Sequence, residues 1–204
     1  MTLSEFDNEI RKDHNVVCGC DEAGRGPLAG DVFAAAVIFD KDTVIEGIND
    51  SKKLTAKKRE ELFDEIIEKA VDFSIQTATV EEIEDINILN AAMLAMKRAV
   101  EDMDTKPDVC LIDGNKTPEG LECPAIAVVK GDAKSQAVAA ASILAKVARD
   151  RYMEQMAEQY PEYRFEKHKG YGTKLHYQMI DRYGPCGIHR MSFLKKYYAK
   201  KNGH

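Results

Sequence analysis

Residues 16–27 read Val-Val-Cys-Gly-Cys-Asp-Glu-Ala-Gly-Arg-Gly-Pro, an apolar run that ends in two adjacent carboxylates and a glycine-rich basic turn. The apolar run over 16–20 predicts a buried strand. Two neighbouring ionised carboxylates at its end are costly to bury, because each loses hydration and repels the other. Divalent cations offset both costs through hard oxygen ligands. The Gly24-Arg25-Gly26 turn follows at once, and its amides and guanidinium can approach a phosphate or a sugar closely.

Outward from this strand, the pattern predicts an α/β protein. Four further strands are expected over 32–39, 73–79, 108–112 and 125–129. Helices are expected over 56–71 with Thr55 as its cap, from Asn87 or Asn90 to 103, over 133–159, and near 173–183 and 190–198. The short link between the first two strands favours antiparallel pairing, whereas the helices between later strands favour parallel pairing. We therefore expect a five-stranded mixed sheet covered by helices on both faces.

Carboxylates stand at three of the expected strand ends: Asp21-Glu22, Asp113 and Asp132. If these ends are neighbours, four carboxylates meet and can hold one or two Mg²⁺ or Mn²⁺ ions, which at a spacing of about 4 Å would clamp a phosphoryl transfer. Two of the acids also have structural explanations. Asp113 precedes Gly114 in a common turn pair, and Asp132 precedes a long helix that it could cap. The joint occurrence favours the metal site.

The charge of the chain is distributed unevenly. Its net charge is −6, yet residues 163–204 carry ten Lys/Arg against two Asp/Glu, a local charge of +8. The remainder therefore carries −14. This asymmetry indicates a basic C-terminal surface that faces a polyanion, although a solvated lysine-rich helix explains it equally well.

Composition and cysteine usage bound the class of protein. With 204 residues, 44% hydrophobic and 31% charged, the chain fits one soluble globular domain, or one with a small appendage. No apolar run approaches 18 residues and the N-terminus lacks a secretory pattern, so we expect neither a membrane span nor export. The five cysteines are odd in number and lie mostly in apolar runs, which indicates reduced thiols in a cytoplasmic protein. A monomer is the default expectation.

Three features of the second half of the chain admit two explanations each. Ser135, Ser142, Lys146 and Arg149 share roughly one face of the expected long helix, which faces either a phosphate backbone or solvent. Tyr171 stands between two glycines in the basic segment, where it either stacks on a sugar or base or packs half-buried. His189 favours a surface or capping role over that of a ligand or base, and Asp150 favours a local ion pair.

Seven motifs in order resemble the ribonuclease HII family (type 2 ribonuclease H), in particular its bacterial branch. They are Asp-Glu-Ala-Gly-Arg-Gly-Pro-Leu-Ala-Gly (21–30), Asn-Asp-Ser-Lys-Lys-Leu (49–54), Leu-Ile-Asp-Gly-Asn (111–115), Lys-Gly-Asp-Ala-Lys-Ser (130–135), Ala-Ala-Ala-Ser-Ile-Leu-Ala-Lys-Val-Ala-Arg-Asp (139–150), Lys-Gly-Tyr-Gly-Thr (169–173) and His-Arg-Met-Ser-Phe (189–193). The ordered set spans nearly the whole chain. The resemblance implies a ribonuclease H-like fold, with a catalytic domain over 1–160 and a basic helical extension over 161–204 packed on it.

The resemblance also implies an activity and a site. It implies metal-dependent endonucleolytic cleavage of RNA in RNA–DNA hybrids, and nicking on the 5′ side of a ribonucleotide embedded in duplex DNA, leaving a 3′-hydroxyl and a 5′-phosphate. The implied ligands of Mg²⁺ or Mn²⁺ are Asp21, Glu22, Asp113 and Asp132. The implied substrate contacts are Gly24, Arg25 and Gly26 at the ribose 2′-hydroxyl, Tyr171 at the junction ribose, and Lys52, Lys53, Ser135 and Lys146 at phosphates.

Other functions remain open on the sequence alone. One is another two-metal nuclease of the same fold, or a hybrid-specific ribonuclease without single-ribonucleotide activity. Another is a hybrid-binding module without catalysis, against which the presence of all four acids argues. A strand-end aspartate phosphatase would need Asp-x-Asp after the first strand, where this chain has Asp-Glu.

Overall fold

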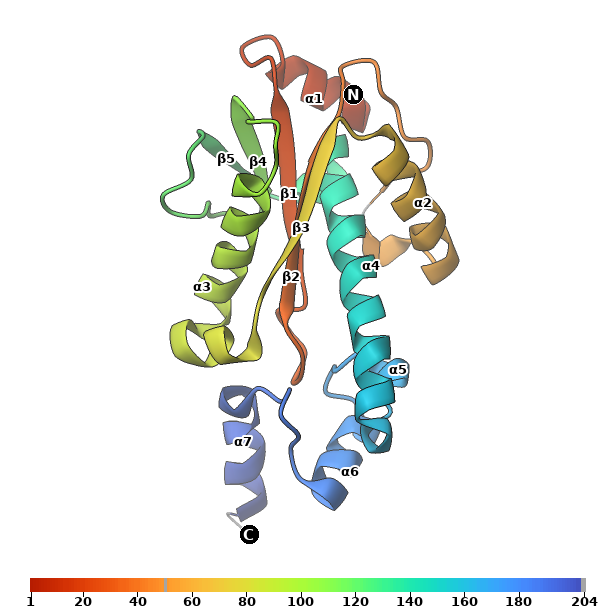
Figure 1. The fold of residues 1–204 in the computed structure, drawn as a ribbon, viewed down its shortest axis with the longest axis vertical. Coiled ribbons are helices and arrows are strands. Elements are labelled where there is room, and N and C mark those ends of the chain that lie inside the picture. Colours follow the sequence, from red (N-terminus) through yellow and green to blue (C-terminus); the bar gives the residue numbers. More distant parts are fainter. Residues whose placement is uncertain (50, 203–204) are drawn as a thin grey trace.

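A twisted sheet of five strands in the order β3-β2-β1-β4-β5 forms the centre of the computed structural model, which describes residues 1–49 and 51–202 (Figure 1). The strands are β1 (Val17–Ala23), β2 (Val32–Ile38), β3 (Asp72–Ala78), β4 (Val109–Asp113) and β5 (Ala125–Val128). β1 pairs antiparallel with β2 and parallel with β4, and β4 pairs parallel with β5. The predicted five-stranded mixed sheet of an α/β protein is therefore confirmed.

The direction of β3 differs from the expectation. A helix links it to β2, which favoured parallel pairing, but the two strands are antiparallel from Val32↔Ala78 to Ile38↔Asp72. The segment after β2, described at 39–49 and 51–55, leads the chain away, and α2 (Ala56–Lys69) then brings it back to the end of β2 (Figure 1). The Val71 amide donates to the Ile38 carbonyl there, at 2.9 Å. Because the connection returns the chain to the same end of the sheet, β3 runs antiparallel to β2. Parallel pairing would require a crossover to the opposite end.

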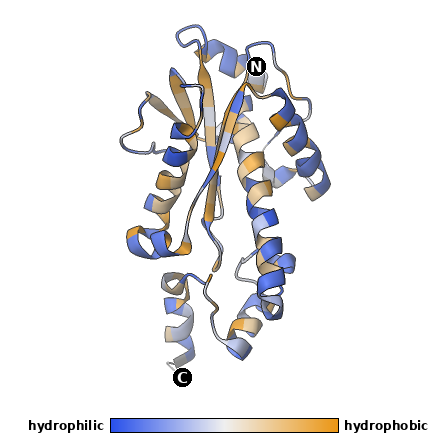
Figure 2. Cartoon of the chain, in the orientation of Figure 1, coloured by the Kyte–Doolittle hydropathy of each residue, from blue (hydrophilic) through white to orange (hydrophobic). Residues whose placement is uncertain are grey.

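Helices cover both faces of the sheet, because successive strand residues point to opposite sides. On one face Ala35 and Val37 pack with α2 and with α4 (Gln136–Gln159). On the other, Cys18, Cys20 and Ala34 pack against α3 (Val80–Glu101). Figure 2 shows the strands mostly apolar and the outer side of α2 hydrophilic. All five cysteines are free thiols, as predicted.

Helix α4 lies unusually close to β1. A Cβ built on Gly19 would stand 2.2 Å from the carbonyl carbon of Ala137, so only glycine fits there. The helix begins at Gln136, three residues later than predicted, and the Ser135 hydroxyl caps it by accepting from the Val138 amide at 3.1 Å. The alternative in which Asp132 caps this helix is therefore wrong. Asp132 lies in a separate 3-10 turn, Gly131–Ala133.

Two helical segments were not expected from the sequence. α1 (Leu3–Ile10) packs at the start of α4, where the Asp7 carboxylate accepts from the Ala137 amide at 2.9 Å. α3 begins at Val80 and is interrupted at Asn87, whose φ of 68° is not helical. The Asn87 side chain accepts from the Leu89 and Asn90 amides at 3.0 and 3.2 Å, so Asn87 is the cap of the predicted second part.

The C-terminal residues form three helices beyond one end of the sheet: α5 (Phe165–His168), α6 (Lys174–Tyr183) and α7 (Met191–Asn202) (Figure 1). α5 and α6 pack on the end of α4 and on the 24–31 loop through an apolar cluster that includes Ala29, Met153 and Phe165. α7 packs on the same loop and on α6 through a second cluster, formed by Leu28, Ile180 and Leu194. The lysines of α7 at 195, 196, 200 and 201 stay exposed. No helix within the described residues is long and apolar enough to cross a membrane.

Candidate active site

Three of the predicted acids come together where β1 and β4 end. The strands run parallel in a register that pairs Cys20 with Ile112, so the next residues, Asp21 and Asp113, are neighbours across them. The Asp21 side chain is only 5% exposed. Burial raises the pKa of Asp21 well above its usual range, and the nearby charges of Glu22 and Asp113 raise it further. The ionised carboxylates therefore form a crowded cluster of negative charge that is unfavourable at neutral pH.

The fourth acid, Asp132, is tied to this cluster through the turn that follows β5. The Gly131 amide donates to the Asp113 carboxylate at 2.6 Å, which fixes the 3-10 turn against the end of β4. Asp132 itself is 7% exposed. Asp21 and Glu22 thus lie on β1, Asp113 lies at the end of β4 and Asp132 lies just after β5. That the four acids form one metal site stays a prediction.

The donor set fits a divalent cation. Within the described residues, Asp21 forms no ion pair, and the hydrogen bonds that lower its pKa come from Ser142 and the Glu22 amide. The positive groups nearby are already paired: Arg25 with Glu22 at 3.0 Å and Lys146 with Asp150 at 2.6 Å. No three carboxylate, imidazole or thiol groups in the described part of the chain already surround a common point. The oxygens of the buried Asp21 carboxylate are hard donors of the kind that Mg²⁺ and Mn²⁺ prefer.

A groove of about 510 Å³ is lined by Asp21 and Glu22, whereas Asp113 and Asp132 are not among its lining residues. One wall is the Gly24-Arg25-Gly26 turn, in which Gly24 has a φ of +102° and packs against the Arg149 side chain. The other wall carries Tyr171, whose ring is 43% exposed. A Cβ on Gly26 would stand 3.7 Å from that ring. The two motifs that the sequence singled out as ribose contacts thus line one groove, although 145 residues separate Gly26 from Tyr171.

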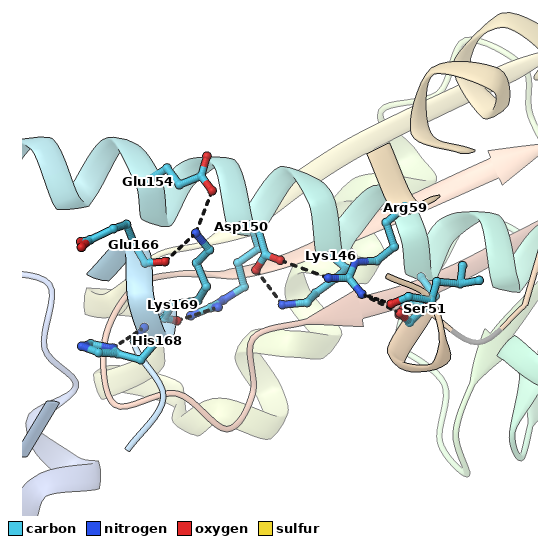
Figure 3. A network of polar contacts seen from close by, with 12 residues as sticks. Ser51, Arg59, Lys146, Asp150, Glu154, Glu166, His168 and Lys169 are labelled. Carbon is cyan, nitrogen blue, oxygen red and sulfur yellow. Dashed lines mark hydrogen bonds and ion pairs between the residues drawn. The ribbon is translucent and has the colours of Figure 1, made fainter. Parts of the chain in front are cut away.

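The predicted phosphate contacts have different positions. Lys146 lines the groove and forms the predicted local ion pair with Asp150, within the network drawn in Figure 3. Lys53 is exposed on the 3-10 turn Ser51–Lys53. The side chain of Lys52 lies outside the described residues. Ser135 is fully buried as the cap of α4 and is closed to a phosphate, so its prediction as a substrate contact is not supported.

Ser142 and Ser51 form a floor for the groove that the sequence did not reveal. Their hydroxyls lie 2.9 Å apart, and both line the groove. The Ser51 carbonyl accepts from Arg59, as Figure 3 shows. At Ser142 the polar face of α4 therefore faces the groove and contacts Ser51 and Asp21.

Arg149 and His189 also differ from expectation. Arg149 is fully buried and donates to the carbonyls of Ala29, Asp31 and Lys169 at 3.0 to 3.3 Å. His189 is buried rather than on the surface, 3.0 Å from His176 between their Nε2 atoms. A basic residue type signals exposure in a sequence, so nothing in the local pattern distinguished these buried side chains.

The two histidines form a directed chain of hydrogen bonds that ends at Tyr171. The Cys186 amide donates to His189 Nδ1 at 2.9 Å, so His189 carries its proton on Nε2 and donates it to His176 Nε2. His176 then carries its proton on Nδ1, 3.0 Å from the Tyr171 carbonyl oxygen that accepts it. Burial, helped by neighbouring His168, lowers the pKa of both imidazoles to about 4. The pair is therefore neutral at pH 7.

This pair predicts an acid-sensitive stability. Because the folded pKa of about 4 lies below the ordinary 6.5, the unfolded chain binds protons first as the pH falls. The contribution of the neutral histidines to the free energy of unfolding is complete above about pH 6.5 and is lost as the pH falls from there to about 4. We expect the free energy of unfolding by urea to fall by about 2 kcal/mol more between pH 7.5 and pH 5 in the native protein than in His176→Gln. His14→Gln, outside this network, should keep the native pH dependence; equal slopes for the native protein and His176→Gln would contradict the neutral pair.

The family model for ribonuclease HII matches residues 18–196. Among curated relatives, the ribonuclease HII of Caldicellulosiruptor saccharolyticus is 54% identical over 93% of this chain and 92% of its own. That of Idiomarina loihiensis is 58% identical over 87% of this chain and 95% of its own.

Solved structures agree in fold. The crystal structure of ribonuclease H2 from Pyrococcus horikoshii OT3 is 28% identical, covers 93% of this chain and 100% of its own, and has a TM-score of 0.75. The ribonuclease HII of Archaeoglobus fulgidus, solved in complex with PCNA, is 25% identical over 86% of this chain and 94% of its own, with a TM-score of 0.67. A Bst ribonuclease HIII solved with Mn²⁺, 17% identical over 83% of this chain and 63% of its own, shares the fold with a TM-score of 0.66. With a family match over 18–196 and relatives more than half identical across nearly all of its length, the chain belongs to the ribonuclease HII family of endoribonucleases.

Proposed function

We propose that this chain hydrolyses the RNA strand of RNA–DNA hybrids and nicks duplex DNA on the 5′ side of a single embedded ribonucleotide, leaving a 3′-hydroxyl and a 5′-phosphate. Membership of the ribonuclease HII family supports the first activity. The observation that carries the second is the groove itself, in which the buried acid Asp21, the Gly24-Arg25-Gly26 turn and Tyr171 face one space. One space thus holds the groups suited to cutting and those suited to recognising a ribose.

The proposed cation would be Mg²⁺ or Mn²⁺, one or two ions, held by Asp21, Glu22, Asp113 and Asp132. When bound, it supplies Lewis acidity at the scissile phosphate and offsets the charge that develops there. Asp21 and Asp113 hold their carboxylates side by side through the β1–β4 register, and the Gly131 amide orients the Asp113 carboxylate. Preorganised oxygens of this kind need no costly rearrangement when the substrate arrives.

The substrate would be positioned by the walls of the groove. The amides of the Gly24-Arg25-Gly26 turn can approach a ribose 2′-hydroxyl closely, and this hydroxyl is what distinguishes RNA from DNA. The guanidinium of Arg25 and the ammonium of Lys146 provide positive charge for adjacent phosphates. The exposed lysines of α7 extend that charge along a polyanionic duplex. The protein would act as a monomer, since one chain supplies every wall of the groove. It would act in the cytoplasm, in the removal of ribonucleotides and RNA primers.

Cleavage of a 5′-labelled DNA duplex that carries one ribonucleotide tests the proposal. With Mg²⁺ we expect a single cut on the 5′ side of the ribonucleotide, and none with EDTA. A cut at another position, or cleavage that persists in EDTA, would contradict it. Cleavage of a continuous hybrid alone would identify a hybrid-specific ribonuclease, and binding without cleavage of either substrate would identify a binding module.

Tyr171 offers a second check on the substrate wall. Its ring is exposed in the groove, with Lys146 Nζ 6.0 Å from the ring centre. Replacement by alanine removes the stacking surface, so we expect kcat/KM on the one-ribonucleotide duplex to fall about tenfold or more. Tyr171→Phe keeps the ring and should stay within about threefold of the native protein. Equal losses in both variants would assign the effect to the hydroxyl and contradict stacking.

A further inference from the structure

A fully buried guanidinium stands directly behind the Gly24-Arg25-Gly26 turn. Arg190, which lies just before α7, donates to the carbonyls of Gly24 at 2.7 Å, Arg25 at 3.2 Å and Pro27 at 2.9 Å. Its Nε and Nη2 atoms also donate to the Gly30 carbonyl, at 2.8 and 2.6 Å. One side chain therefore satisfies four carbonyls of a single loop.

This arrangement is costly for stability alone. Arg190 forms no ion pair with any described residue. Burial, and then the charge of buried Arg149, lower its pKa to about 9, against the more distant charge of Asp31, which raises it. A buried cation without a carboxylate is unfavourable unless its donors are all satisfied. The carbonyl oxygens offset that cost only while the loop keeps this one conformation. The charge therefore favours a particular loop geometry over the alternatives that an apolar side chain would allow.

The geometry that it favours presents two amides to the groove. In a trans peptide the carbonyl of one residue and the amide of the next point in opposite directions. Because the Gly24 and Arg25 carbonyls point back to Arg190, the Arg25 and Gly26 amides point away from it. Neither amide donates a hydrogen bond to any described residue, and both residues line the groove. Two free donors thus face the space where a sugar hydroxyl would lie.

We propose that Arg190 is a specificity-determining positioning residue, which holds the Arg25 and Gly26 amides in the orientation that distinguishes a ribose from a deoxyribose. The proposal rests on the function proposed above for the turn. Residues 189 and 190 also position Tyr171 on the opposite wall of the groove. The Arg190 amide donates a hydrogen bond to the Leu28 carbonyl, and the Leu28 amide donates one to the carbonyl of Gly170, next to Tyr171. His189 reaches the Tyr171 carbonyl through His176. Residues 189 and 190 therefore fix the distance between the Gly24-Arg25-Gly26 turn and Tyr171, the two walls of the groove.

The test compares the affinity for two duplexes of the same sequence, one all-DNA and one with a single ribonucleotide, by fluorescence anisotropy in EDTA. The Kd for the all-DNA duplex divided by the Kd for the one-ribonucleotide duplex measures recognition of the 2′-hydroxyl. Arg190→Lys keeps the buried charge but cannot reach four carbonyls in a fixed fork. We expect this ratio to fall by about tenfold toward one, the change for one weakened hydrogen bond. Affinity for the all-DNA duplex should change little.

Arg98→Lys is the matched control, because Arg98 also donates to a carbonyl, that of Thr77, but on α3 and outside the groove lining. It should lower thermal stability and keep the native ratio. An Arg190→Lys protein that is folded by circular dichroism and keeps the native ratio would overturn the inference. A native ratio of one would instead overturn the proposed function of the turn.

A measurement on the native protein covers the case in which Arg190→Lys does not fold. Amide resonances of Arg25 and Gly26 should shift on addition of the one-ribonucleotide duplex and not of the all-DNA duplex, and the Arg190 Nε hydrogen should remain slow to exchange. Shifts of equal size with both duplexes, or an Arg190 hydrogen that exchanges at the rate of an exposed arginine, would overturn the inference.

Discussion

Replacing Asp21 with asparagine is expected to reduce cleavage of an RNA–DNA hybrid by about a thousandfold or more, while the protein remains folded and still binds the hybrid. Asparagine keeps the shape and can still accept the hydrogen bond from the Glu22 amide, 2.7 Å away in the native protein. It removes the negative charge that a divalent cation would neutralise. Single-turnover cleavage with Mg²⁺ and hybrid binding in EDTA measure the two properties separately.

The same substitution should stabilise the fold. Asp21 is buried beside Glu22 and Asp113, and its raised pKa reflects the cost of that charge. We expect Asp21→Asn to increase the free energy of unfolding by about 1 kcal/mol at pH 7 in EDTA. Asp13→Asn, at an exposed position after α1, should change neither property. Asp132→Asn should match the loss of cleavage, and a folded Asp21→Asn protein that cuts at the native rate would refute the site.

Replacing Gly19 with alanine is expected to destabilise the protein by at least about 3 kcal/mol. The new Cβ would stand 2.2 Å from the Ala137 carbonyl carbon and 2.3 Å from the Val138 nitrogen. Both are backbone atoms of α4, so no side-chain rotation relieves the overlap. The helix cannot retreat easily either, because Asp7 holds its first turn.

Urea unfolding measures this effect, and the clash also predicts reduced cleavage, since Asp21 lies two residues further along the same strand. Gly187→Ala is the matched control: its Cβ would lie 3.5 Å from the Tyr160 hydroxyl, an ordinary contact, and its φ is not positive. We expect Gly187→Ala to change stability by less than about 1 kcal/mol. Equal stabilities of the two variants would contradict the close approach of α4.

The sequence predicted those parts of the molecule that short-range patterns encode. Apolar runs located four strands and partial alternation located β3. Asp21 and Asp113 lie near the ends of β1 and β4, and Asp132 lies just after β5, as strand-end reasoning expects of parallel neighbours. Thr55 was correctly predicted as a helix cap. The direction of β3 was not, since it depends on the path of 39–55, which carries no periodic signal.

The residues that sequence reasoning missed act over long separations. Arg149 and Arg190 bind carbonyls more than 100 residues away, and a lone arginine in a sequence indicates a surface position. Ser135 shows the converse error. Its place in a family-like motif suggested a phosphate contact, but the start of α4 at Gln136 makes it a buried cap. Both outcomes depend on tertiary packing that local propensity does not contain.

The contacts of Arg190 have a consequence for synthesis of the chain on the ribosome. The carbonyls that it holds belong to residues made 160 or more positions earlier. All five strands and α4 can therefore emerge and pair while the groove still lacks its rear support. We expect a nascent chain stalled before residue 190 leaves the exit tunnel to show native-like sheet protection and poor nuclease activity. The selective cutting proposed above would thus begin only after residue 190 has left the exit tunnel.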